Sequence, residues 1–181
     1  MRWTRPFTWF ALLLLTGCAH NFPVPEDTEG GYLAFPMEVI DETKSPFYYA
    51  YSFKVFDRET NEEVDSFVMN PANGVHVRSF GPLPAGEYYL GEKTTYAKQS
   101  ANVRHQYKPN PRRVHFPFTI HEDTISVLNQ QLWVYKRFQA DGRGNSTSNQ
   151  VLGLTQATRD RALAQLAEQD ESGSWIIEIG E

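Results

Sequence analysis

The chain has 181 residues, enough for one domain with a substantial core, and its 22 acidic residues outnumber its 17 basic residues, for a net charge of −5. An acidic chain is a poor general binder of nucleic acid, because neutralising phosphates requires clustered lysine and arginine side chains. Aromatic residues make up 14% of the chain, a content that favours β-structure over helix.

Residues 1–18 have the three parts of a secretory signal in their usual order. Arg2 and Arg5 come first, an apolar run covers residues 7–15, and small residues follow. The apolar run is about half of the ~20 residues that a membrane-spanning helix needs, so the segment is predicted to be a leader rather than a membrane span. It ends in LTGC, residues 15–18, and Cys18 is the one cysteine of the sequence.

The LTGC tetrad resembles the lipobox of bacterial lipoproteins, in which the cysteine receives a diacylglyceryl group and the signal is cleaved before it. The resemblance implies a signal peptide at 1–17 and a lipid on Cys18, which holds the protein on a membrane. Loss of Arg2 and Arg5 with the signal leaves 15 basic residues against 22 acidic residues, a net charge of −7. The alternative is an ordinary signal followed by an incidental cysteine.

In bacterial lipoproteins, the residue after the lipidated cysteine indicates whether the protein stays in the inner membrane or reaches the outer membrane. In enterobacterial lipoproteins an Asp at that place favours retention in the inner membrane, whereas this chain has Ala19. The resemblance therefore implies the outer membrane, with the domain facing the periplasm or, as an alternative, the cell surface. Acylation of Cys18 would leave no thiol for a disulfide, a metal site or a nucleophile.

The remaining chain is predicted to be a tether followed by one domain. Residues 18–31 mix proline, glycine and acid and predict a flexible tether, so the domain is expected to cover residues 32–181. Alternating apolar residues over 47–55 predict a strand with one buried face. Further strands are expected at 64–70, 75–80, 112–122, 124–138 and 174–180.

Proline and capping residues refine these elements. Pro117 cannot donate to a strand ladder, which indicates that its strand lies at a sheet edge or contains a bulge. The polar residues 139–150 are expected to form a loop. One helix is predicted over 155–169, with Thr155 as its N-cap. Its narrow apolar stripe consists of Ala162, Leu163, Leu166 and Ala167.

About seven short strands separated by turns predict a mainly β fold, an antiparallel β-sandwich with one C-terminal helix. Residues 55–90, from VFD through LPAGEYYL, resemble the transthyretin-like (prealbumin-like) modules of bacterial envelope proteins. In those modules a strand ending in VFD is followed by a hairpin, an LPAGxY turn and another core strand. The resemblance implies a transthyretin-like or immunoglobulin-like sandwich. The C-terminal helix departs from the plain module, so no function is carried over from it.

The sequence contains no familiar catalytic or metal-binding motif. His115 and His121 would share a strand face but lie about 20 Å apart, too far for one zinc ion. The serine motifs GxSxG and SxxK are absent, and the acidic residues gather in predicted turns. We therefore expect no cofactor, no metal and no enzymatic activity. Two carboxylates that converge on a cleft from distant segments form no local sequence motif, so a glycosidase-type pair stays an alternative.

Residues 93–121 contain no acidic residue, and a positive potential is therefore expected along this segment. The sequence KPNPRR, residues 108–113, predicts an extended and exposed path. We expect the segment to bind an anionic partner, and the alternative is a basic loop that lies on the chain's own acidic surface. Its six cations are Lys93, Lys98, Arg104, Lys108, Arg112 and Arg113, and Tyr96 and Tyr107 are interleaved among them. The predicted binding residues are Lys98, Arg104, Tyr107, Lys108, Arg112 and Arg113.

Three functional classes stay open on the sequence. The first is a non-enzymatic outer-membrane lipoprotein whose domain binds or scaffolds another envelope component, a protein or a glycan. The second is an inhibitor or immunity-type protein against a periplasmic enzyme, and the third is a hydrolase of envelope polymers. The first class is preferred because the predicted anchor on Cys18, the β-domain and the missing catalytic motifs all fit it.

Overall fold

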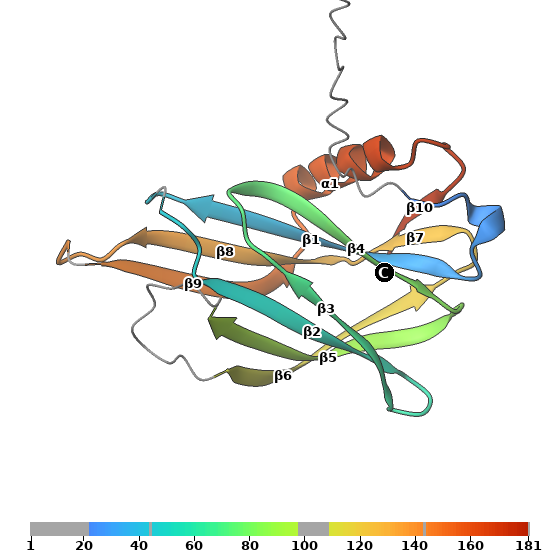
Figure 1. The fold of residues 1–181 in the computed structure, drawn as a ribbon, viewed down its shortest axis with the longest axis horizontal. Coiled ribbons are helices and arrows are strands. Elements are labelled where there is room, and N and C mark those ends of the chain that lie inside the picture. Colours follow the sequence, from blue (N-terminus) through green and yellow to red (C-terminus); the bar gives the residue numbers. More distant parts are fainter. Residues whose placement is uncertain (1–21, 44, 98–108, 143, 181) are drawn as a thin grey trace, which may run out of the picture.

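A computed structural model describes residues 22–43, 45–97, 109–142 and 144–180 (Figure 1). Within these ranges the chain is mainly β, with one α-helix near its C-terminal end. The first elements in chain order are η1 (Pro25–Asp27), β1 (Gly31–Asp41), β2 (Tyr49–Asp57), β3 (Glu63–Met69), β4 (Gly74–Leu83) and β5 (Gly86–Ala97). They are followed by β6 (Asn110–Ile120), β7 (Thr124–Val127), β8 (Gln130–Phe138), β9 (Asn145–Gly153), α1 (Gln156–Gln169) and β10 (Ile176–Ile179).

The strands form two sheets that pack face to face. Sheet B is antiparallel, with the order β3-β2-β5-β6. In sheet A, β4 pairs with one edge of β1. The other edge of β1 pairs first with β7 and then with β8. On their far sides, β7 pairs with β10 and β8 pairs with β9. A single core lies between the sheets, where the ring centroids of Phe35 on β1 and Phe53 on β2 are 5.0 Å apart.

Sheet A is mixed, which corrects the prediction of an antiparallel architecture. β7 and β8 run parallel to β1, and β10 runs parallel to β7. The reason is where the chain crosses between the sheets. It leaves β6 at the end where β1 begins, so β7 and β8 run in the direction of β1. Helix α1 later returns the chain to that same end before β10.

Several predicted elements are confirmed. Tyr51, Phe53 and Val55 on β2 are fully buried, as their alternation indicated. β6 is an edge strand of sheet B, in agreement with the position of Pro117 within it. Thr155 caps α1, because its side chain accepts a hydrogen bond from the backbone N–H of Thr158. Within the predicted stripe of α1, Ala162 and Leu166 are buried and Ala167 is exposed.

Two strands were missed, and one predicted strand is interrupted. β1 is buried on both faces, between sheet B and α1, and therefore lacks the alternation that marks a half-buried strand. β9 includes the second half of the predicted polar loop at 139–150 and is an edge strand with mostly polar side chains. The predicted strand at 124–138 is β7 followed by β8, with a break where the Leu128 N–H donates to the Ala34 carbonyl oxygen.

The described residues before β1 pack against the domain, so the folded unit begins earlier than residue 32. The ring centroid of Phe22 lies 5.1 Å from that of Tyr32, and the Phe22 N–H donates to the carbonyl oxygen of Gln169. The indole N–H of Trp175 donates to the Pro23 carbonyl oxygen at 2.8 Å. From Phe22 onward, the segment predicted as a tether therefore belongs to the fold. Across the described ranges, no helix is long and apolar enough to cross a bilayer.

Candidate anion-binding end

Four connections between strands leave the two sheets at the same end, which we call the loop end. The strand register places Asp41 beside Lys136, Val39 beside Gly74 and Tyr49 beside Ala97. The β1–β2, β3–β4, β5–β6 and β8–β9 connections therefore all start from this end, on the left of Figure 1. The described residues before β1 and the β2–β3 hairpin lie at the opposite end.

Charge differs between the two ends in the described part of the chain. At the opposite end, Arg58 pairs with Glu87 at 2.8 Å amid a large excess of acid. The acidic residues there include Glu26, Asp27, Glu29, Asp57, Glu59, Glu62, Glu87, Glu122 and Asp123. At the loop end the basic residues are Lys93, Arg112, Arg113, Lys136 and Arg137, and the acidic residues are Asp41, Glu42, Glu92 and Asp141. The loop end is therefore the more positive of the two.

Lys93 lies between the sheets at the loop end. Gly91 is an extra residue in β5 relative to β2, and this bulge reverses the alternation of β5 and turns Lys93 inward. A Cβ atom at Gly91 would lie 2.6 Å from the Phe56 ring, so the site requires glycine. Lys93 is 7% exposed, and its Nζ donates to Asn149 Oδ1 on β9 at 2.5 Å. It also lies 5.8 Å from the centroid of the Tyr51 ring.

Lys93 and its neighbour Arg112 form the most unusual electrostatic feature of this end. Burial lowers the pKa of Lys93, and the guanidinium of Arg112, its cross-strand partner on β6, lowers that pKa further. Among the described residues, neither side chain has a carboxylate partner within ion-pair distance. A buried ammonium is ordinarily paired, so these two cations favour an incoming anion.

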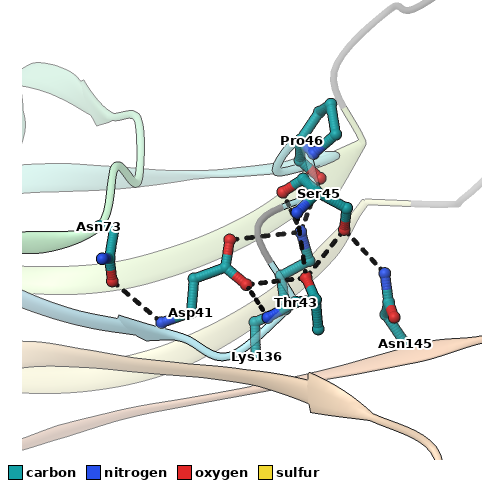
Figure 2. A network of polar contacts seen from close by, with 7 residues as sticks. All are labelled: Asp41, Thr43, Ser45, Pro46, Asn73, Lys136 and Asn145. Carbon is teal, nitrogen blue, oxygen red and sulfur yellow. Dashed lines mark hydrogen bonds and ion pairs between the residues drawn. The ribbon is translucent and has the colours of Figure 1, made fainter.

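Lys136 is the second buried lysine of the loop end, and its ammonium group is neutralised and hydrogen-bonded by groups of the protein itself. The residue is 2% exposed, and its Nζ donates to the backbone carbonyl oxygens of Ser45 and Pro46 (Figure 2). The carboxylate of Asp41 lies 3.7 Å from the same Nζ, and the centroid of the Phe47 ring lies 4.6 Å from it. Burial lowers the pKa of Lys136, and Asp41 opposes that shift.

The polar network around Lys136 joins the β1–β2 connection to the β3–β4 connection and to the first residue of β9 (Figure 2). The carboxylate of Asp41 accepts hydrogen bonds from the N–H and the hydroxyl of Thr43, at 2.8 and 2.7 Å. The Asp41 N–H donates to Asn73 Oδ1 of the β3–β4 connection, and Asn145 Nδ2 donates to the Ser45 hydroxyl. The network therefore fixes the base of the loop end and contributes little positive charge to a ligand.

The residues predicted from the acid-free segment are only partly described. Arg112 and Arg113 are exposed on the first half of β6, which confirms the extended path expected there. Lys98, Arg104, Tyr107 and Lys108, together with Cys18, lie outside the described residues. Within those residues, no group of three or more histidine, cysteine or acidic side chains is arranged to hold a metal ion.

Sequence reasoning listed Lys93 among the cations but missed its burial, and it missed Lys136 entirely. The glycine at 91 within a strand pattern was a usable signal, because an isolated glycine there often marks a bulge. No local signal marks Lys136, whose partners Asp41, Ser45 and Pro46 are about ninety residues away in the chain.

No protein-family model matches this chain, and no similar protein was found among curated proteins or solved structures.

Proposed function

We propose that the chain is a lipid-anchored outer-membrane lipoprotein whose domain is a non-enzymatic module that binds or scaffolds an anionic envelope component at the loop end. The domain would be a variant of the transthyretin-like or immunoglobulin-like sandwich, with a mixed sheet and an added helix. The observation that carries the binding proposal is the pair of the buried Lys93 and its exposed cross-strand neighbour Arg112, which both lack a carboxylate partner in the described part of the chain.

The position of the predicted anchor supports this arrangement. Cys18 precedes Phe22 by four residues, a distance of at most about 14 Å in an extended chain. Phe22 packs on Tyr32 and Trp175, near the start of β1 and therefore toward the opposite end. An acylated Cys18 would hold that region close to the membrane and leave the loop end available to another component.

The partner is expected to carry several negative charges, as an acidic protein surface or an anionic glycan does. Exposed ion pairs contribute about 0–1 kcal/mol each and are screened by salt. Useful affinity therefore requires several cations to act together. Arg112 and Arg113 add planar guanidinium groups that pair with carboxylate or phosphate through two hydrogen bonds.

The anchor is tested by metabolic labelling with palmitate. Wild-type protein should incorporate the label, and Cys18→Ser should not. Equal labelling of the two proteins would contradict the lipobox assignment, as would a mature protein that begins elsewhere than at Cys18.

The binding surface is tested by charge reversal in the full-length protein. Arg112→Glu/Arg113→Glu should abolish capture of the native partner from detergent-solubilised envelopes, and capture by wild type should fall as salt rises. Arg58→Glu/Arg161→Glu is the matched control, because it makes the same charge change at exposed residues of the β2–β3 hairpin and of α1, outside the loop end. Equal capture by all three proteins would refute the assigned surface.

A further inference from the structure

The edge where β3 of sheet B faces β4 of sheet A contains a groove of about 620 Å³, a size within the range of small-molecule sites. Its apolar floor consists of core side chains that meet at this edge: Met37, Phe67, Met69 and Phe80. The ring centroids of Phe67 and Phe80 lie 5.0 Å apart.

Arg78 lies at the rim of this groove. Phe80 packs against Phe67, so the alternation of side chains on β4 turns Arg78 toward sheet B as well. Arg78 is exposed, and within the described ranges its guanidinium has no ion pair. None of the described residues that line the groove is acidic, in a chain with 22 acidic residues. The groove therefore combines an apolar floor with one uncompensated cation at its rim.

We propose that this groove binds a fatty acid, with the acyl chain on the apolar floor and the carboxylate on Arg78. The guanidinium group is planar and pairs with a carboxylate through two parallel hydrogen bonds. A thin acyl chain fits a groove that is open along a strand edge, and each methylene it buries adds apolar contact. The site is separate from the loop-end cations, because Lys93, Arg112 and Lys136 do not line this groove.

Photolabelling of the full-length protein in neutral phosphatidylcholine vesicles tests this proposal. A diazirine-bearing palmitate should crosslink to peptides that contain residues 66–72 and 76–80, as mapped by mass spectrometry. Arg78→Glu should lower this labelling at least about tenfold, because it replaces the charge-assisted pair with repulsion. The matched control Arg58→Glu, far from the groove, should label as wild type does.

A second variant keeps the test independent of Arg78. Ala72 is an exposed residue of the groove lining, and Ala72→Trp would fill the groove without changing the charge. It should also lower labelling, and a photoreactive alkyl ammonium of the same chain length should not label the groove of wild type. Equal labelling of wild type and both variants, or equal labelling by the cationic analogue, would overturn the proposal. Self-association of Arg78→Glu with unchanged labelling would also overturn the proposal. It would indicate that Arg78 prevents pairing of the strand edge with another chain.

Discussion

Asp41→Asn removes the negative charge that faces the buried ammonium of Lys136 and preserves the shape of the side chain. The side chains of Asp41 and Lys136 are 7% and 2% exposed. Breaking a buried ion pair from one side costs about 3–5 kcal/mol, because it leaves a charge without its partner. A domain of this size loses about 2–4 °C of melting temperature per kcal/mol, so we expect the melting temperature to fall by roughly 6–20 °C.

The double variant Asp41→Asn/Lys136→Met separates the loss of a partner from the loss of the pair. It removes both charges, and we expect it to be more stable than Asp41→Asn, because apolar replacement of a buried ion pair is often nearly neutral. Thermal unfolding of wild type, both single variants and the double variant, followed by circular dichroism, gives the coupling energy. A loss below about 1 kcal/mol in Asp41→Asn, as for a surface pair, with no recovery in the double variant, would refute this reasoning.

Three further predictions follow from the same contacts. Lys93→Met should raise the free energy of unfolding near neutral pH, because it removes a buried ammonium whose pKa is lowered below 10.5. This gain in stability should shrink as the pH rises toward 10.5, because in that window Lys93 of folded wild type loses the proton that the unfolded chain keeps, and wild type becomes more stable. Urea titrations at neutral and alkaline pH measure the two free energies of unfolding, and no gain for Lys93→Met at neutral pH would contradict the reasoning. A chain that begins at Tyr32 should be about 2–4 kcal/mol less stable than one that begins at Phe22, because it lacks the partly buried Phe22 ring and the hydrogen bonds made by residues 22 and 23. Equal melting temperatures of the two chains would argue against that packing. Gly91→Ala should cost about 1–3 kcal/mol, because its Cβ would lie 2.6 Å from an aromatic ring, whereas Gly153→Ala, with nothing within 4 Å, is the neutral control.

Local periodicity predicted the elements that are exposed on one side. The strand β2 has one face on the core, so Tyr51, Phe53 and Val55 alternate with polar residues in the sequence. The helix α1 was predicted from Thr155 at its N-cap and from an apolar stripe, which packs on sheet A. In each case the signal and the structure depend on residues that are close in the chain.

The elements and residues that were missed depend on distant contacts. β1 is covered on both faces, so its continuous apolar sequence carries no period. β9 is polar because it is an edge strand, and its strand identity comes from pairing with β8. The inward turn of Lys93 depends on the Gly91 bulge, which the rings of Phe56 and Tyr89 cover. The parallel pairing of β1 with β8 follows from where the chain crosses between the sheets.

Site-specific photocrosslinking in intact cells tests the central claim most directly. A photoreactive phenylalanine analogue would replace Phe138 at the loop end, where the native side chain is 60% exposed, or Ile176 toward the opposite end, where it is 55% exposed. The two positions are matched in exposure and differ in the end of the domain they mark. The proposed function predicts a crosslinked envelope component at 138 that Arg112→Glu/Arg113→Glu abolishes, and none at 176. A crosslinked component at 176 with none at 138 would contradict it.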